Sequence, residues 1–133
     1  MNRKKILIVD DDAAIREVLT LQLGRLNFDT VAAANGQEAV ARFASEKPDL
    51  VIMDLLMPIM DGLAACQKIR SLENKTLDTH APIVFLTARD TRHDQMSSAV
   101  SGGDDFITKP ISLQELRERV EAALARAKHQ PTP

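Results

Sequence analysis

Two apolar runs of this chain end in aspartates. Residues 6–9 are followed by Asp10 and Asp11, and residues 50–53 are followed by Asp54. If the two runs are neighbouring strands of one sheet, these carboxylates lie close together where the strands end. Carboxylates at such short distances repel one another unless a cation or a proton compensates them. The spacing therefore predicts a cation site at this edge of the sheet.

Oxygen ligands without nitrogen or sulfur favour magnesium at this site. Carboxylates suit Mg²⁺, which binds oxygen in an octahedral arrangement and keeps several waters. No histidine or cysteine near Asp10, Asp11 or Asp54 has the spacing of a zinc ligand. We therefore expect Mg²⁺ as the cofactor, and Mn²⁺ as a metal that can substitute for it.

Thr87 and Lys109 also stand where apolar runs end. A lysine ammonium and Mg²⁺ together offset the charge of a phosphoryl group, while the threonine hydroxyl donates to one of its oxygens. A carboxylate can attack phosphorus and form an acyl phosphate, a transfer that needs mainly positioning and charge stabilisation. Asp54 follows a rigid buried strand, which makes it the candidate nucleophile.

Each of these residues has a simpler interpretation when it is taken alone. Asp12 is better explained as a helix N-cap than as a metal ligand, and Lys109-Pro110 is by itself an ordinary turn. A functional site is favoured because polar residues end four different apolar runs of the chain.

Short apolar runs alternate with helical stripes along the chain, and capping residues precede the stripes. Residues 71–81 are polar and form the longest loop candidate, in which His80 is expected to be solvated. On the first helix, Val18 and Leu19 are assigned to one buried face. Strands are expected at residues 4–9, 28–34, 49–53, 82–87 and 106–108, and helix starts at Asp12, Asn35, Gly62 or Leu63, residues 91–94, and Ser112.

Five strands that alternate with five helices predict an α/β fold. Right-handed crossovers leave few topologies, and we expect the flavodoxin-like, doubly wound parallel sheet, (βα)5, with strand order 2-1-3-4-5. In such sheets, ligands bind beyond the carboxyl ends of the strands, at the point where the strand order reverses. The aspartates, Thr87 and Lys109 all belong to that edge.

Composition places the chain among soluble single domains. It has 133 residues, with 17 Lys and Arg against 19 Asp and Glu, and a formal charge of -2. That balance argues against direct nucleic-acid binding, and no apolar stretch is long enough for a membrane span. The lone Cys66 is expected to be a small core residue of a cytoplasmic protein. Residues 1–128 are expected to form the domain and residues 129–133 a tail or truncated linker.

Four motifs taken together resemble those of bacterial two-component response-regulator receiver domains, the CheY-like superfamily. They are residues 9–12, 54–62, 86–88 and 108–110, and the resemblance runs from about residue 4 to about residue 128. It implies a phosphorelay switch in which a phosphohistidine of a sensor histidine kinase or histidine phosphotransfer protein phosphorylates Asp54. The chain would then be a signalling domain that catalyses only its own phosphotransfer and slow autodephosphorylation.

The resemblance also implies a role for each site residue. Asp11 and Asp54 would ligate Mg²⁺ directly, together with the backbone carbonyl of Leu56, whereas Asp10 would act largely through water. Lys109 would contact the phosphoryl oxygens, and the Lys109-Pro110 peptide bond would be cis.

The same resemblance implies a switch. Thr87 would move toward the phosphoryl group and Phe106 would turn inward behind it, which alters the surface of the fourth helix, fifth strand and fifth helix. The expected binding partner of that surface is a downstream protein or a missing output domain. Formation of a homodimer on phosphorylation is an open alternative.

Two positions depart from the pattern of many relatives, and two others bear on hydrolysis of the aspartyl phosphate. Phe106 stands where tyrosine is frequent, and Gly103 stands where alanine is frequent and is expected to loosen the end of the fourth helix. Leu56 and Arg89 flank the path of attacking water in this family. Because Leu56 has no polar group that could orient water, we expect slow hydrolysis of the aspartyl phosphate.

Two other classes of protein fit the sequence less well. An aspartate-nucleophile phosphohydrolase of the haloacid-dehalogenase type needs a second aspartate two residues after the nucleophile, where this chain has Leu56. A nucleotide-binding flavodoxin-like domain needs a glycine-rich phosphate loop after the first strand, where this chain has Asp10 and Asp11.

Overall fold

The computed structural model describes residues 3–76, 80–88 and 92–128. Five strands alternate with five helices in these ranges. The strands are β1 (Lys5–Val9), β2 (Asp29–Ala33), β3 (Leu50–Met53), β4 (Ile83–Thr87) and β5 (Asp105–Thr108). The helices are α1 (Ala13–Arg25), α2 (Gly36–Glu46), α3 (Gly62–Thr76), α4 (Arg92–Val100) and α5 (Leu113–Lys128). Over the part of the chain so described, no helix combines the length and hydropathy of a membrane span.

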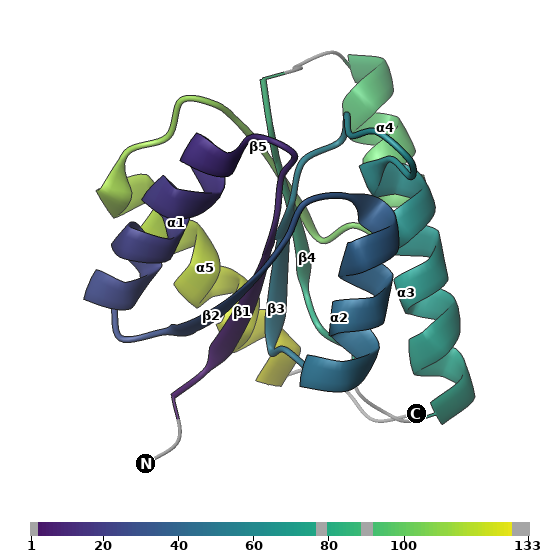
Figure 1. The fold of residues 1–133 in the computed structure, drawn as a ribbon, viewed down its shortest axis with the longest axis horizontal. Helices are drawn as coiled ribbons and strands as arrows, with labels where there is room; N and C mark the ends of the chain where they lie inside the picture. The colour runs from purple at the N-terminus through teal and green to yellow at the C-terminus, as the bar shows by residue number, and fades with distance from the viewer. Residues whose placement is uncertain (1–2, 77–79, 89–91, 129–133) are drawn as a thin grey trace.

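The strands form one parallel sheet in the order β2-β1-β3-β4-β5, which confirms the predicted fold class. Helices α1 and α5 cover one face of the sheet, and α2, α3 and α4 cover the other (Figure 1). The register pairs Val9 with Met53, so β1 and β3 end level with each other. The residues that follow them, Asp10 and Asp54, therefore emerge side by side at the carboxyl edge of the sheet.

Alternation along the strands divides the core into two clusters, because successive side chains of a strand point to opposite faces. Ile6 and Ile8 of β1 face α1 and α5, whereas Leu7 and Val9 face α2 and α3. All four side chains are essentially inaccessible to solvent. The central strand β1 is therefore apolar on both faces, as a buried parallel strand must be.

Side-chain caps begin α1, α2 and α5 at the predicted positions, whereas residue 91, where the predicted cap of α4 begins, lies outside the described residues. Asp12 accepts a hydrogen bond from Ala14 N–H at 2.9 Å, and Asn35 accepts one from Glu38 N–H at 2.8 Å. Ser112 accepts one from the N–H of the glutamate three residues later, at 3.0 Å. These caps satisfy amide groups that have no partner inside the helix.

Residues 71–81 do not form the predicted loop over their whole length, because α3 continues to Thr76. Long-range contacts stabilise this polar end of the helix. Arg70 Nη1 donates to Glu73 at 2.7 Å and to the Ala81 carbonyl at 2.8 Å, and Glu73 accepts from Ala81 N–H at 2.7 Å. The prediction was wrong because it considered only the polarity of the segment, whereas Ala81, the partner of both Arg70 and Glu73, comes from outside the helix.

Two side chains also lie in different surroundings from those predicted. Val18 is 51% exposed, because neighbouring positions on a helix point about 100° apart and α1 buries the stripe that contains Leu19 and Leu23. His80 is not simply solvated, since its Nε2 lies 3.1 Å from Asp104 Oδ1. Cys66 is a core residue as predicted, and burial raises the pKa of its thiol to about 11.

Gly103 packs against the ring of Phe85, a side chain with no exposure. A Cβ at position 103 would lie 2.7 Å from Phe85 Cε2 and 2.9 Å from the Ser98 carbonyl oxygen. Both distances are shorter than a carbon side chain tolerates without a shift of its neighbours. Close packing therefore explains the glycine at this position, whatever its effect on the end of α4.

We expect Gly103→Ala to destabilise the domain by about 1–3 kcal/mol, the usual cost of overpacking a core. Urea denaturation followed by circular dichroism measures this loss. Phe85→Leu removes the ring, so the double variant should lose less than the sum of the two single losses. A Gly103→Ala variant as stable as the parent would show that the ring moves aside at no cost.

Candidate functional site

Asp10 continues from β1 and has a donor on each carboxylate oxygen. Its N–H extends the sheet ladder by a hydrogen bond of 3.2 Å to the Ala33 carbonyl. Its Oδ1 accepts from Asp12 N–H at 2.9 Å, and its Oδ2 accepts from Lys109 Nζ at 2.8 Å. The side chain is 4% exposed, so these donors compensate a buried charge.

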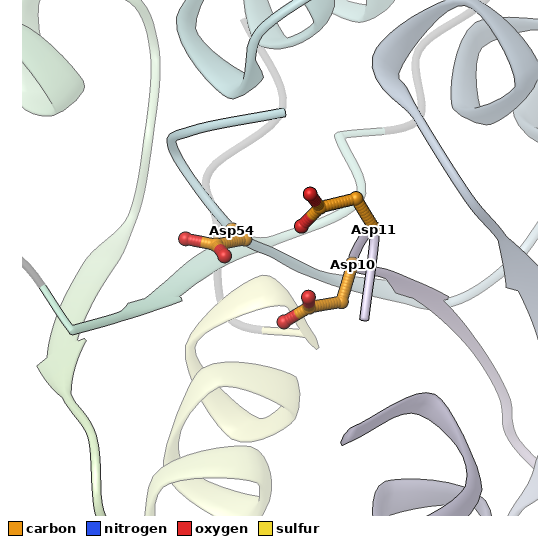
Figure 2. A group of neighbouring side chains, drawn as sticks. All are labelled: Asp10, Asp11 and Asp54. Atoms are coloured by element: carbon orange, nitrogen blue, oxygen red, sulfur yellow. The ribbon is translucent and has the colours of Figure 1, made fainter. Parts of the chain in front are cut away.

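Asp10, Asp11 and Asp54 converge as the sequence predicted. Each offers a carboxylate oxygen, and these oxygens lie within 4.8 Å of one another. Figure 2 shows the three carboxyl groups gathered beyond the ends of β1 and β3. Asp10 is buried, Asp54 is intermediate and Asp11 is exposed. The cluster is therefore open to solvent on the side of Asp11 and closed beneath Asp10.

Two glycines with no room for a side chain hold the segment that follows β3 through backbone hydrogen bonds. Gly62 N–H donates to the Leu55 carbonyl at 2.8 Å, and a Cβ on Gly62 would overlap the Asp54 carbonyl oxygen. Gly36, at the start of α2, donates to the Met60 carbonyl at 3.0 Å with equally little space. Leu55 N–H donates to Asp54 Oδ1 at 2.7 Å. The backbone thus fixes both the loop and one oxygen of Asp54.

Lys109 brings a positive charge between two of the carboxylates. Its Nζ lies 2.8 Å from Asp10 Oδ2 and 3.5 Å from Asp54 Oδ2. Burial alone lowers the pKa of the ammonium, but the hydrogen bond to Asp10 and the charges of Asp54 and Asp10 outweigh it, so the pKa lies above its usual value. Lys109 is therefore charged throughout the neutral pH range. The peptide bond to Pro110 is cis, as expected.

The two candidate switch residues belong to the same edge of the sheet. Thr87 ends β4 with 1% exposure, and its carbonyl accepts from Lys109 N–H at 2.8 Å. Phe106 is half-buried in β5 and packs against the core cluster on the side of α2 and α3. In the register of the sheet, Phe106 pairs with Phe85 and Thr87 with Thr108.

The loop that follows Asp54 presents apolar side chains to solvent. Leu56 is 54% exposed and Ile59 is 76% exposed. Ile59 has a φ of 71°, a left-handed conformation that a β-branched residue adopts at a cost of about 1–3 kcal/mol. Arg89, the other residue expected beside the path of water, lies outside the described residues.

The donor set fits Mg²⁺. Asp11 is exposed and Asp54 is intermediate, so both offer oxygen ligands at a solvent-accessible edge, and oxygen donors with retained water are what Mg²⁺ prefers. Three carboxylates against the single ammonium of Lys109 leave a local excess of negative charge that favours a divalent cation. Within the described ranges, this is the one acidic, histidine or cysteine group close enough to hold a metal ion.

Sequence reasoning missed two arginines that organise the fold. Arg16 of α1 donates from Nη1 to the Asp10 carbonyl at 2.7 Å. Arg70 of α3 donates from Nε to the Gly102 carbonyl at 2.9 Å and from Nη2 to Asp104 at 2.7 Å. Neither pairing has a local signature, because arginine on a helix is ordinarily a solvated residue and these acceptors lie outside the helix.

Fold and site together define a flavodoxin-like α/β domain with an acidic ligand site where its strand order reverses. The chain matches the family described as "Response regulator receiver domain" over residues 6–121. The protein thus belongs to the response-regulator receiver domain family. It is a signalling domain of two-component systems, and the phosphohydrolase alternative falls away.

Two curated relatives are named as transcriptional regulators and are about twice as long as this chain. The "Probable transcriptional regulator ycf27" of Porphyridium aerugineum is 39% identical over 126 residues, which cover 95% of this chain and 50% of the relative. The "Alkaline phosphatase synthesis transcriptional regulatory protein PhoP" of Bacillus subtilis is 39% identical over 124 residues, which cover 93% and 50%. The chain therefore spans about half the length of these relatives.

Solved structures of similar fold cover nearly the whole chain. A putative response regulator from Chloroflexus aurantiacus is 34% identical with a TM-score of 0.84, covering 94% of this chain and 100% of the other. The receiver domain of the sensor histidine kinase PA1611 from Pseudomonas aeruginosa is 27% identical with a TM-score of 0.83, covering 93% and 99%. That structure is described as having a magnesium ion coordinated in its active site cleft.

Proposed function

We propose that this receiver domain accepts a phosphoryl group on Asp54 from the phosphohistidine of a sensor histidine kinase or histidine phosphotransfer protein. The observation that carries the proposal is the position of Lys109. Its ammonium lies 3.5 Å from the Asp54 carboxylate and is held by Asp10 at 2.8 Å. A cation held beside an aspartate at a solvent-accessible edge is placed to receive the negative charge of an incoming phosphoryl group.

The transfer replaces one bond to phosphorus with another. A carboxylate oxygen of Asp54 forms the new bond, the bond between phosphorus and the donor's imidazole nitrogen breaks, and the electron pair leaves with that nitrogen. Lys109 offsets the charge on the phosphoryl oxygens, and Thr87 supplies a hydroxyl donor once it reaches them. The rigid end of β3 and the loop contacts of Gly62 hold Asp54 in place.

The metal would be held by Asp11, Asp54 and the backbone carbonyl of Leu56, with Asp10 acting through water. Both oxygens of Asp10 already accept hydrogen bonds, from Asp12 and Lys109, which supports the indirect role. Bound Mg²⁺ would supply charge neutralisation and orientation of the phosphoryl oxygens.

The proposed output is a change in the surface formed by α4, β5 and α5. Thr87 and Phe106 lie on neighbouring strands, so a shift of Thr87 toward the phosphoryl group opens space for Phe106 to turn inward. Such a switch is a shift in the populations of two conformations, because phosphorylation stabilises one of them more than the other. We propose that residues 1–128 form the signalling domain of a cytoplasmic protein and that residues 129–133 form a tail or linker. The partner that binds the altered surface would be a downstream protein, an output domain or a second copy of the chain.

Intact mass spectrometry tests the proposal directly. The protein is incubated with acetyl phosphate and Mg²⁺, then with the same donor and excess chelator. We expect one added phosphoryl group that hydroxylamine removes, and no addition in the presence of chelator. Modification that resists hydroxylamine, or that proceeds equally well without a divalent metal, would contradict the proposed aspartyl phosphate.

Leu56 is expected to make the aspartyl phosphate long-lived, because its side chain cannot orient an attacking water. Leu56→Asn introduces a polar group at an exposed position and should shorten the half-life by about threefold to tenfold, the effect of positioning one water. Decay of the phosphorylated mass after donor removal measures the rate. Ile59→Asn, a change to the same residue type at another exposed position of the loop, serves as the control and should leave the half-life unaltered. A parent half-life as short as that of a free acyl phosphate would refute the expectation.

A further inference from the structure

Arg16 contacts the acidic site without belonging to it. Its Nη1 donates to the backbone carbonyl oxygen of Asp10 at 2.7 Å, a short hydrogen bond strengthened by the charge of the guanidinium. Arg16 is half-buried in the first turns of α1, six residues after its acceptor. None of the steps of phosphoryl transfer described above uses it.

The acceptor lies at the point where the chain leaves the sheet. Strand β1 ends at Val9, and the last rung of its ladder is the hydrogen bond from Asp10 N–H to Ala33. The carbonyl of Asp10 is therefore just beyond the regular ladder, where Arg16 supplies its donor. The Arg16 side chain of α1 thus donates to a carbonyl that, among the described residues, no further hydrogen bond of the sheet reaches.

That hydrogen bond orients a peptide unit. The Asp10 carbonyl and the Asp11 N–H belong to one planar group, so holding the oxygen fixes the plane of both. That plane in turn fixes the N–Cα bond of Asp11. On the other side of Asp11, the Asp12 N–H is held by Asp10 Oδ1 at 2.9 Å. Asp11 is thus constrained from both sides through its backbone.

Asp11 needs such a constraint because its own side chain is exposed. A solvent-exposed carboxylate has no core packing to select a rotamer or to aim it. Its oxygen nevertheless lies within 4.8 Å of those of Asp10 and Asp54. The backbone clamp between β1 and α1 accounts for this convergence.

We infer that Arg16 is a positioning residue for the proposed Mg²⁺ site, and that it acts by aiming the Asp11 carboxylate toward Asp54. The inference rests on the proposed function, since it assigns Asp11 as a direct ligand. Groups that orient metal ligands without touching the metal change its affinity by about tenfold or more when they are removed.

Whether metal affinity rises or falls when Arg16 is replaced distinguishes a positioning role from an effect of its charge. A guanidinium near a cation site repels the cation, so removing its charge alone would strengthen metal binding. Removing the donor that orients Asp11 would weaken metal binding. A purely structural contact would lower the stability of the domain and leave the affinity of the folded protein unchanged.

The test measures Mn²⁺ binding to the unphosphorylated full chain by electron paramagnetic resonance, with Mg²⁺ as competitor. Arg16→Met removes both charge and donor, and we expect it to weaken Mn²⁺ binding about tenfold. Arg16→Lys keeps a charged donor and should bind within about threefold of the parent. Arg25→Met, which removes the same charge from the other end of α1, is the matched control and should bind as the parent does.

Thermal unfolding without metal gives the folded fraction of each variant, so affinities refer to folded protein. Should Arg16→Met unfold at the assay temperature, Arg16→Gln provides the neutral variant and is expected to show a smaller loss of affinity. Binding by the folded neutral variant that equals or exceeds that of the parent would overturn the inference. A parent that binds no Mn²⁺ at this site would instead refute the metal site of the proposed function.

Discussion

Asp54→Asn should remain unphosphorylated under conditions in which the parent gains one phosphoryl group. The amide is a poor nucleophile and cannot form the acyl phosphate, whereas its shape preserves the packing at the end of β3. The substituted side chain would also keep an oxygen that can accept from Leu55 N–H, the hydrogen bond that holds Asp54 at 2.7 Å. The fold should therefore survive while acceptor activity is lost completely.

Asp61→Asn is the matched control for this prediction. Asp61 lies in the same loop and accepts from Ala64 N–H at 2.9 Å as the cap of α3, a role that asparagine also performs. The control should be phosphorylated at the rate of the parent, as measured by intact mass with acetyl phosphate and Mg²⁺. Phosphoryl groups retained by Asp54→Asn would place the acceptor on another residue and overturn the central assignment.

Arg70→Met should destabilise the domain by about 3–5 kcal/mol, the range for breaking a buried ion pair by removing one partner. Its guanidinium donates to Glu73 at 2.7 Å, to Asp104 at 2.7 Å, and to the carbonyls of Ala81 and Gly102. Glu73 is 6% exposed, so its charge would lose its arginine partner in a dry environment. The large cost follows because this buried carboxylate would keep its Ala81 N–H donor but lose the compensating charge of Arg70.

Urea denaturation followed by circular dichroism measures the loss. Arg117→Met removes an arginine from an exposed pair with Glu121 on α5 and should cost less than about 0.5 kcal/mol, since such surface pairs contribute little. Adding Glu73→Gln to Arg70→Met should recover part of the stability, because a neutral amide costs less to bury. A loss for Arg70→Met no larger than that for Arg117→Met would mean that water replaces the guanidinium freely.

The Arg70 cluster also ties together three segments far from the carboxyl edge of the sheet. It connects α3 with the carbonyl of Gly102 after α4 and with Asp104 before β5. His80 completes the cluster, with Nε2 3.1 Å from Asp104. The start of β5 is therefore anchored at the end of the sheet opposite the acidic site, two residues before Phe106.

Features with local causes were predictable from the chain. Alternating apolar runs placed every strand to within about one residue of its observed bounds. Asp12, Asn35 and Ser112 cap helices as expected, because each cap depends only on residues two or three positions apart. Residues 71–76 were predicted as loop because they are polar, and Ala81, which donates to Glu73, lies beyond the helix. Polarity alone does not reveal such pairings.

The sequence by itself determined which residues stand at the strand ends, because an apolar run that stops in Asp10 or Asp54 has left the core. It also determined the sheet order, since right-handed crossovers allow few alternatives. Only the tertiary structure decided how these side chains are held: Lys109 on Asp10, Arg16 on the Asp10 carbonyl, and Gly62 against Asp54. Such contacts join residues whose distance in space is set by the packing of whole helices on the sheet, which no local pattern encodes.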